Sequence, residues 1–242
     1  MNLVITENYE ESSRALADML ETVIAEKKDA ILGLATGSSP IGMYQCLVED
    51  FQSGKVDFSS VSTINLDEYI GLSKENPQSF RFFMDQHFFS KVNIEEERIH
   101  MIDGSGTLAE EIKKYNEFLS DHTIDFLILG IGNNGHIGFN EPSDVFIADT
   151  HEVMLTKETI RANSRFFEKI EDVPISAVTM GMAGITRAKK VVLIASGEAK
   201  ADAVEKLFAD NVIDPMIPCS ILKICRDVTV IVDRSLYERT KL

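Results

Sequence analysis

Residues 130–142, GIGNNGHIGFNEP, contain the densest group of side chains that could do chemistry. His136 and Glu141 are the titratable pair in this segment, and histidine is the side chain best suited to moving protons near neutral pH. Glycines crowd around the pair, which is typical of a ligand that lies close to the backbone. The segment therefore predicts an acid–base site.

The same segment contains the letters GxGxxG, which occur in dinucleotide-binding folds. A dinucleotide site also needs a helix directly after these letters and an acidic residue about 20 positions further on. Gly138 and Pro142 interrupt any such helix, so the pattern does not favour a dinucleotide site.

A second source of acid–base chemistry is the segment NLDEY, residues 65–69. Asp67 and Glu68 follow a predicted strand, and neighbouring side chains of an extended chain point to opposite sides. One carboxylate could face a cleft as a base while the other forms local hydrogen bonds. A polar strand end without a chemical role has the same pattern, so this alternative stays open.

The turn TGSSP at residues 36–40 joins an apolar run to a helical pattern and is a possible anion site. Its glycine permits an unusual backbone turn, and its two serines offer hydroxyls and a helix cap. The free N–H groups of a helix start attract anions, although a capped turn without a ligand is the alternative. Distant cations could complete the site, Arg bidentately and Lys as a point charge. The candidate phosphate-binding residues are Thr36, Gly37, Ser38, Ser39, Arg165 and Lys200.

Other chemistries and partners lack their signatures. The sequence has neither an HExxH motif nor a Cys/His cluster, so we expect no metal, and it has no GxSxG elbow of a serine hydrolase. The widely spaced Cys46, Cys219 and Cys225 predict reduced thiols in a cytoplasmic protein. With 24 Lys+Arg and 39 Asp+Glu the net charge is −15, which argues against nucleic acid and anionic membrane surfaces as partners. No apolar stretch is long enough to span a bilayer.

The elements that must position these residues alternate between short β-branched runs and amphipathic helical patterns. This alternation predicts an α/β fold with an open, mostly parallel sheet flanked by helices on both faces, Rossmann-like and doubly wound. No linker or repeat divides the chain, so we expect one domain over residues 1–242, with its active site at the carboxyl ends of the strands. The predicted strands are residues 2–6, 30–35, 61–66, 125–131, 190–195 and 228–233. The predicted helices cover residues 16–24, 78–89 and 108–119, the stretch after Pro40 and the stretch between the last two strands.

Five segments bear a family resemblance: LATGSSP (34–40), NLDEY (65–69), GIGNNGHIGFNEP (130–142), ANSRFF (162–167) and ASGEAK (195–200). In this order, and over essentially the whole chain, they resemble the glucosamine-6-phosphate deaminases of the glucosamine/galactosamine-6-phosphate isomerase family. The resemblance implies a cytoplasmic hydrolase that acts on a C–N bond. Its substrate would be a small sugar phosphate, glucosamine 6-phosphate, converted to fructose 6-phosphate and ammonium in amino-sugar catabolism without a cofactor.

The resemblance also implies roles for individual residues. Asp67 matches the base that moves a proton between carbon 2 and carbon 1. His136 matches the group that opens the pyranose ring, and Glu141 matches its orienting partner. An aldose–ketose shift does need a carboxylate at the sugar carbons and an acid–base group at the ring oxygen. The family's phosphate site matches residues 36–39, Arg165 and Lys200.

Two departures from the family pattern change what we expect. Asn134 stands where many members carry Asp; it can accept a hydrogen bond from the imidazole but adds no charge, so we expect activity with an altered pH profile. His151 and Val153 stand where allosteric members carry basic residues, and the chain ends at Leu242, shorter than those enzymes. We therefore expect an unregulated monomer or small homo-oligomer, with a lid over residues 152–170.

Two alternatives remain. A 6-phosphogluconolactonase has a similar fold and also binds a sugar phosphate, but it needs no carbon-2 base, so the NLDEY segment argues against it. A sugar-phosphate-binding regulator with an inactive site could lose Asp67 or His136, and both are present.

Overall fold

The computed structural model describes residues 1–164 and 167–242. In this part of the chain a seven-stranded sheet has the order β1-β10-β9-β6-β2-β3-β5, and every neighbouring pair in it is parallel. The mostly parallel α/β sheet expected from the sequence is therefore confirmed. The strands of this sheet are β1 (Asn2–Thr6), β2 (Ile31–Leu34), β3 (Ser62–Asn65), β5 (Ile99–His100), β6 (Phe126–Leu129), β9 (Val191–Ala195) and β10 (Val228–Asp233).

A second, antiparallel sheet of three strands in the order β4-β8-β7 lies beside the first. Its strands are β4 (Asp67–Tyr69), β7 (His151–Met154) and β8 (Ser176–Thr179). The three strands of this sheet, and β5 of the large sheet, were not predicted from the sequence, because they are short. In addition, β7 has no continuous apolar run: its residues alternate between half-buried and exposed. The long predicted strands, by contrast, agree with the structure to within about two residues at each end, since they are the buried, β-branched runs.

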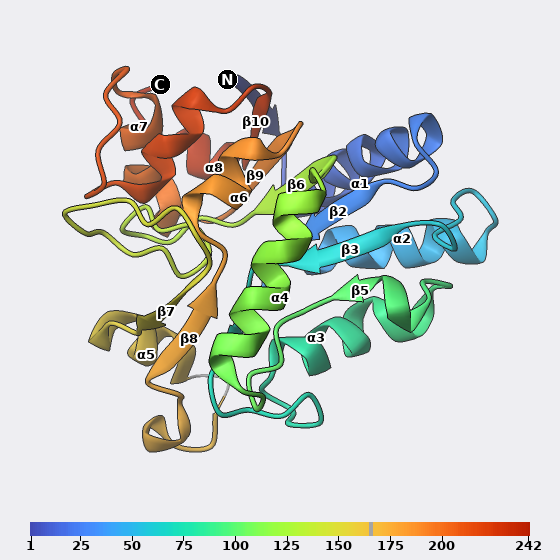
Figure 1. Ribbon diagram of the computed structural model, residues 1–242. Helices are drawn as coiled ribbons and strands as arrows, with labels where there is room; N and C mark the ends of the chain where they lie inside the picture. The colour runs from blue at the N-terminus through green and yellow to red at the C-terminus, as the bar shows by residue number, and fades with distance from the viewer. Residues whose placement is uncertain (165–166) are drawn as a thin grey trace.

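Helices cover the large sheet on both faces, with α4 in front of the sheet and α2 behind it in Figure 1. The α-helices are α1 (Tyr9–Glu26), α2 (Ile41–Gln52), α3 (Phe80–His87), α4 (Leu108–Asp121), α5 (Lys157–Asn163), α6 (Met182–Arg187), α7 (Ala201–Phe208) and α8 (Arg234–Tyr237). Short 3₁₀ helices lie at Phe89–Lys91, Glu96–Arg98, Ile170–Asp172, Glu198–Lys200 and Pro218–Ile224.

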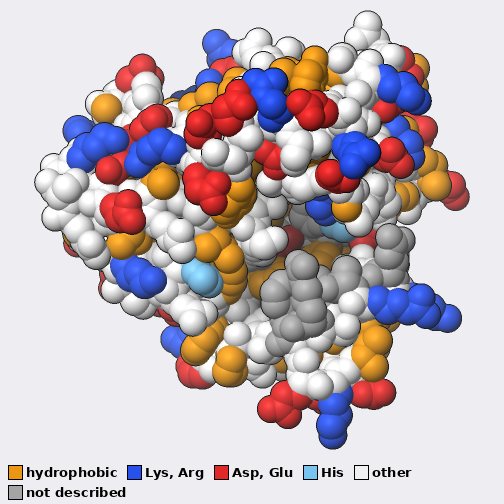
Figure 2. Space-filling view, turned by 180° about the vertical axis from the view of Figure 1, so that it is seen from behind, with side chains coloured by type: hydrophobic (Ala, Val, Ile, Leu, Met, Phe, Trp, Pro, Cys, Tyr) orange, Lys and Arg blue, Asp and Glu red, His pale blue; other side chains and the backbone are white. Residues whose placement is uncertain are grey.

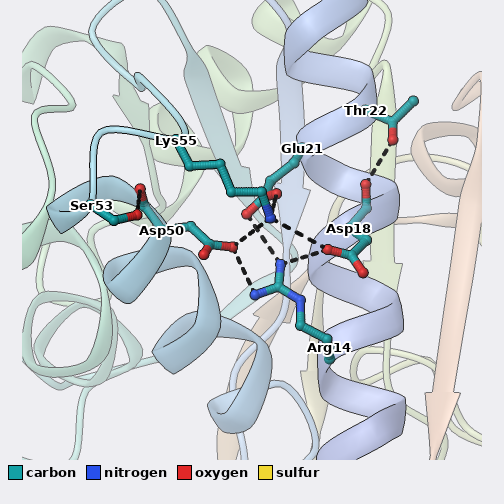
Figure 3. A network of polar contacts seen from close by, with 7 residues as sticks. All are labelled: Arg14, Asp18, Glu21, Thr22, Asp50, Ser53 and Lys55. Atoms are coloured by element: carbon teal, nitrogen blue, oxygen red, sulfur yellow. Dashed lines mark hydrogen bonds and ion pairs between the residues drawn. The ribbon is translucent and has the colours of Figure 1, made fainter.

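A network of ion pairs joins α1 to α2 and to the turn that follows α2 (Figure 3). Arg14 on α1 lies 2.7 Å from Asp50 on α2, and Lys55 lies 2.8 Å from Glu21 and 3.0 Å from Asp50. Isolated surface pairs contribute little, but a network of this kind restricts the orientation of one helix against the other. The C-terminal end of α2, the helix that follows the 36–40 turn, is thus tied to α1.

The chain leaves the centre of the large sheet in both directions. From β2 it continues to β3 and β5 on one side, while β6 is followed by β9 and β10 on the other. The carboxyl ends of β2 and β6 therefore flank a topological switch point, where the connections diverge and leave a crevice. This is the position at which α/β sheets bind ligands.

Candidate active site

A cavity of about 310 Å³ lies at this switch point and opens to the surface, where Figure 2 shows a hollow. Its walls come from the segments that directly follow β2, β3, β6 and β9, as predicted for a parallel sheet. Segments far apart in sequence thus converge because their strands end at the same edge. The polar lining includes Thr36, Ser38, Ser39, Asp67, Gln78, His136 and Lys200.

The structure brings together most of the residues that the sequence singled out. Asp67, His136 and Lys200 line the one cavity, together with residues 36–39. Asn134 and Glu141 lie behind His136 and hold it. Arg165 falls outside the described residues.

Asp67 begins β4, and its half-buried side chain lines the cavity. Burial, and then the neighbouring charge of Glu68, raise the pKa of Asp67 to about 8. The next side chain turns away, as the strand geometry predicts: Glu68 accepts hydrogen bonds from the backbone N–H groups of Tyr69, Phe80 and Arg81. Burial raises the pKa of Glu68 to about 7 against these hydrogen bonds. Of the two carboxylates, only Asp67 is available to a ligand.

The Asn134 amide contacts the His136 ring, and a hydrogen bond to Glu141 fixes which way this amide faces. Asn134 Nδ2 donates a hydrogen bond of 2.7 Å to Glu141 Oε2, so Asn134 Oδ1 faces the imidazole and lies 2.8 Å from its Nδ1. An amide oxygen only accepts, so Nδ1 carries a proton and the neutral ring keeps Nε2 as its acceptor. Asn134 is thus placed where it can orient the imidazole.

Glu141 supplies the negative charge behind this pair. Its Oε2 lies 3.4 Å from His136 Nδ1, and its Oε1 accepts a hydrogen bond of 2.5 Å from the hydroxyl of Thr159. Burial by itself would raise the pKa of Glu141, but His136, Thr159 and Asn134 together lower that pKa to about 2. The carboxylate is therefore ionised at neutral pH and places a negative charge beside the imidazole.

Two glycines of the 130–142 segment lie so close to other site residues that a side chain would not fit there. A Cβ on Gly132 would lie 2.2 Å from Cε1 of His136. Gly138 has φ of +57°, and a Cβ there would lie 2.8 Å from Thr179 Oγ1 and 3.4 Å from Asp67 Oδ2. These glycines make room for the side chains of the site itself.

The turn at residues 36–40 differs from its prediction in one respect. Gly37 adopts the expected positive φ, +87°, but neither Ser38 nor Ser39 caps α2, because the N-cap position falls on Pro40, which has no side-chain oxygen. Instead, a backbone N–H group in the first turn of α2 donates a hydrogen bond to a side chain of α1. Gly42 N donates to Tyr9 Oη over 2.8 Å, and the same hydroxyl donates to Ser38 O over 3.0 Å. Tyr9 therefore ties the turn to α1.

The loop that leads to Lys200 is also held by a residue that the sequence analysis did not single out. Asp233, at the end of β10, accepts hydrogen bonds from the Ser196 hydroxyl and from Gly197 N at its Oδ2, and caps α8 through its Oδ1. The cap could have been recognised from an Asp before a short helical stretch. The contacts of Tyr9 and Thr159 carry no such local signal, because their partners lie 18 to 33 residues away.

Aromatic rings form the remaining wall of the cavity. Tyr69 packs on Phe80 with ring centroids 4.7 Å apart, and Phe80 stacks on Phe139 at 5.9 Å. Such a wall excludes water and strengthens the polar interactions beside it. Within residues 1–164 and 167–242, no three His, Cys, Asp or Glu side chains gather in a group that could hold a metal ion. In the same part of the chain, every helix is too short or too polar to cross a membrane.

Comparison with known families and curated proteins finds matches over nearly the whole chain. Residues 6–231 match the family model described as glucosamine-6-phosphate isomerases/6-phosphogluconolactonase. A glucosamine-6-phosphate deaminase of Thermoanaerobacter sp. (strain X514) is 48% identical over 236 residues, which cover 97% of this chain and 93% of the relative. A glucosamine-6-phosphate deaminase of Clostridium beijerinckii is 46% identical, with both chains covered completely.

Comparison with solved structures also finds matches over nearly the whole chain. A protein described as a monomeric glucosamine-6-phosphate deaminase superposes with a TM-score of 0.95 and 40% identity, over 99% of this chain and 100% of the other. The 6-phosphogluconolactonase of Trypanosoma cruzi superposes with a TM-score of 0.81 at 16% identity, covering 100% of this chain and 97% of the other. At that identity the second match shows a shared fold alone.

Proposed function

The chain belongs to the family of glucosamine-6-phosphate isomerases and 6-phosphogluconolactonases, and from this premise we propose that it is a glucosamine-6-phosphate deaminase. It converts glucosamine 6-phosphate and water to fructose 6-phosphate and ammonium, a step of amino-sugar catabolism. The relatives of 46–48% identity that carry this name support the assignment.

One observation of the site carries the proposal: Asp67 and His136 line the same cavity as the turn at residues 36–39 and Lys200. The deamination requires a base at the sugar carbons, an acid–base group at the ring oxygen and a holder for the phosphate. The hydrolysis of a lactone needs no base at carbon 2, so it would not account for Asp67 in the cavity.

In the first step His136 opens the pyranose ring. Its Nε2 accepts the proton of the anomeric hydroxyl and returns a proton to the ring oxygen, which breaks the C1–O5 bond and yields the aldehyde. The ionised Glu141 stabilises the imidazolium that forms in between, and Asn134 keeps the ring in the tautomer that presents Nε2. Asn134 and Glu141 act from behind His136.

In the second step ionised Asp67 removes the proton from carbon 2 of the open-chain aldehyde, while the substrate's ammonium group gives a proton to the carbonyl oxygen at carbon 1, which yields an enolamine. Asp67 then returns its proton to carbon 1, so that carbon 2 becomes an iminium carbon, and water adds to it. Breakage of the C–N bond releases ammonia, which leaves as ammonium, and the ketone of fructose 6-phosphate remains. The atoms balance with one water and no cofactor.

The phosphate supplies binding energy that positions the reacting carbons. We assign it to Thr36, Gly37, Ser38 and Ser39, with Lys200 and Arg165 as the cations. Arg165 lies in the segment 152–170, which we assign as a lid over the cavity. In this proposal the lid and the large sheet belong to one domain that spans residues 1–242.

We further assign the enzyme to the cytoplasm, as an unregulated monomer or small oligomer. Cys46, Cys219 and Cys225 are free thiols, which suits a reducing compartment. The described structural relative is a monomer, and β7 carries His151 and Val153 where allosteric relatives would need cations.

The proposal is tested by ammonium release from glucosamine 6-phosphate, for the parent and for Asp67→Asn and His136→Gln. We expect release by the parent with a hyperbolic dependence on substrate, and a loss of about 10²- to 10⁴-fold in kcat for each variant. A parent that releases no ammonium but opens 6-phosphogluconolactone would show that the second activity of the family applies.

A further inference from the structure

Glu141 receives a hydrogen bond from outside the loop that holds His136. The hydroxyl of Thr159 on α5 donates to Glu141 Oε1 over 2.5 Å, from 18 residues along the chain. Thr159 is 6% exposed, and the Glu141 side chain is 8% exposed. A buried carboxylate needs protein donors on both oxygens, because water cannot reach them. Thr159 serves one oxygen, while Asn134 serves the other.

The direction of this hydrogen bond is determined by its neighbours. An ionised carboxylate only accepts, so the Thr159 hydroxyl must donate to it and is left with a free acceptor oxygen. That oxygen lies 3.0 Å from Thr156 Oγ1, which donates to it. Two hydroxyls thus form an ordered chain from the N-cap of α5 to Glu141.

The Thr159 hydroxyl is not needed to build its own helix. Thr156 caps α5 by accepting from the backbone N–H of Thr159, over 3.1 Å. A threonine inside a helix commonly bonds a carbonyl of the preceding turn. The Thr159 hydroxyl points across to Glu141 instead, so its contact is with the site.

We propose that Thr159 is a positioning residue for the ring-opening step, and that through it the placement of α5 controls the orientation of His136. Thr159 holds the Glu141 carboxylate so that Oε2 faces Asn134 and Nδ1 of His136. Without this hydrogen bond the carboxylate can rotate about its last side-chain bond, and the Asn134 amide that depends on it loses its orientation. This inference rests on the proposed function, since it assigns the ring opening to His136.

The kinetic test compares Thr159→Val, which keeps the shape and removes the hydroxyl, with Thr159→Ser, which keeps the hydroxyl. Thr186→Val is the matched control, because among the described residues the Thr186 hydroxyl bonds backbone carbonyls of α6 alone. We expect Thr159→Val to lower kcat about tenfold with KM changed less than about twofold. Thr159→Ser should keep at least half of the parental kcat, and Thr186→Val should match the parent. Equal kcat for Thr159→Val and the parent would overturn the proposal, as would an equal loss in Thr159→Ser.

A second measurement does not depend on the substrate. The chain has 5 histidines, so ¹⁵N-histidine NMR resolves their tautomers, and His136→Gln assigns the His136 signals. We expect the parent to show His136 protonated at Nδ1. Thr159→Val should shift or broaden these signals while Thr186→Val leaves them unchanged. Unaltered His136 signals in Thr159→Val would reject the positioning role, even if the parent proved inactive and the proposed function itself failed.

Discussion

At the scale of single residues, the environment of Asp67 decides how the site depends on pH. An exposed aspartate is ionised above pH 4, but burial and the charge of Glu68 raise the pKa of Asp67 to about 8. A base must be deprotonated to accept the carbon-2 proton. For the base that we propose Asp67 to be, the free enzyme at neutral pH therefore holds mostly the protonated form, which cannot accept this proton.

This environment predicts the acid limb of the pH profile. We expect kcat/KM to rise with pH up to about 8, and to fall about tenfold per pH unit well below that value. Glu68→Gln removes the neighbouring charge that raises the pKa of Asp67 while keeping an acceptor for the α3 backbone, so the limb should move to lower pH. Steady-state kinetics between pH 5 and 9 check this.

A limb that stays near pH 4 in the parent would contradict the raised pKa.

The thermal stability of the protein tests the raised pKa of Asp67 independently of activity. A carboxyl group with a raised folded pKa favours folding in its protonated form, and this contribution is lost as pH rises through the folded pKa. Asp67→Asn should therefore unfold at a higher temperature than the parent above pH 8, although we expect it to lose the activity.

At the scale of elements, one buried carboxylate joins the ends of several of them. Asp125, which directly precedes β6, is 5% exposed and bonds Lys27 at 2.6 Å and Lys189 at 2.7 Å. It also accepts from Ile31 N at the start of β2, over 2.9 Å. Burial by itself would raise the pKa of Asp125, but Lys189 and Lys27 lower it below its usual range. Because β2 and β6 flank the cavity, Asp125 holds the two strands in register at the end opposite the site.

We expect Asp125→Asn to lower the free energy of unfolding by about 2 kcal/mol at pH 7, since a charged acceptor with three donors is replaced by an amide. The stability that Asp125 contributes is present above its unfolded pKa near 4, and is lost as pH falls through the lower folded pKa. The difference between variant and parent should thus shrink below pH 4. Urea unfolding at pH 7 and below pH 4 measures the loss in the free energy of unfolding and its dependence on pH.

Asp227→Asn is the matched control for this substitution. Asp227 pairs with Lys190 at 3.1 Å, but its side chain is 42% exposed, so the pair is screened by water. We expect a change within about 0.5 kcal/mol. Equal losses in the two variants would show that burial of the carboxylate is not what matters.

At the scale of the whole molecule, the net charge of −15 opposes the approach of an anionic substrate. Acidic and basic side chains are interspersed on the face in Figure 2, so the repulsion is a property of the summed charge and not of a single acidic patch. Salt screens charges beyond about 10 Å at 0.1 M, whereas groups in contact with the phosphate are screened less.

This balance predicts how the affinity for substrate depends on salt. Raising KCl from 10 to 150 mM should lower KM for glucosamine 6-phosphate by at least about twofold, because the distant repulsion is screened more than the local contacts. Sulfate at equal ionic strength should raise KM instead, since it competes for the phosphate site. A KM that rises with KCl would mean that the local cations outweigh the net charge.

The sequence by itself determined six of the seven strands of the large sheet and the order of the segments that carry the site. Burial of β-branched runs and helical periodicity are local patterns, and parallel strands bring the segments after them to one edge. The placement of Asp67 and His136 in one cavity followed from that rule. The opposite orientation of Asp67 and Glu68 also followed, because it depends only on the geometry of an extended chain.

Only the tertiary structure decided the second sheet, the Tyr9 contact with the 36–40 turn, and the Thr159 bond to Glu141. Each joins residues whose distance in sequence leaves no periodic or spacing signal. The raised pKa of Asp67 belongs to the same class, because it depends on how much water the surrounding elements exclude. Local sequence patterns identify the side chains that can do chemistry, whereas packing between distant segments sets the protonation states and the orientations of these side chains.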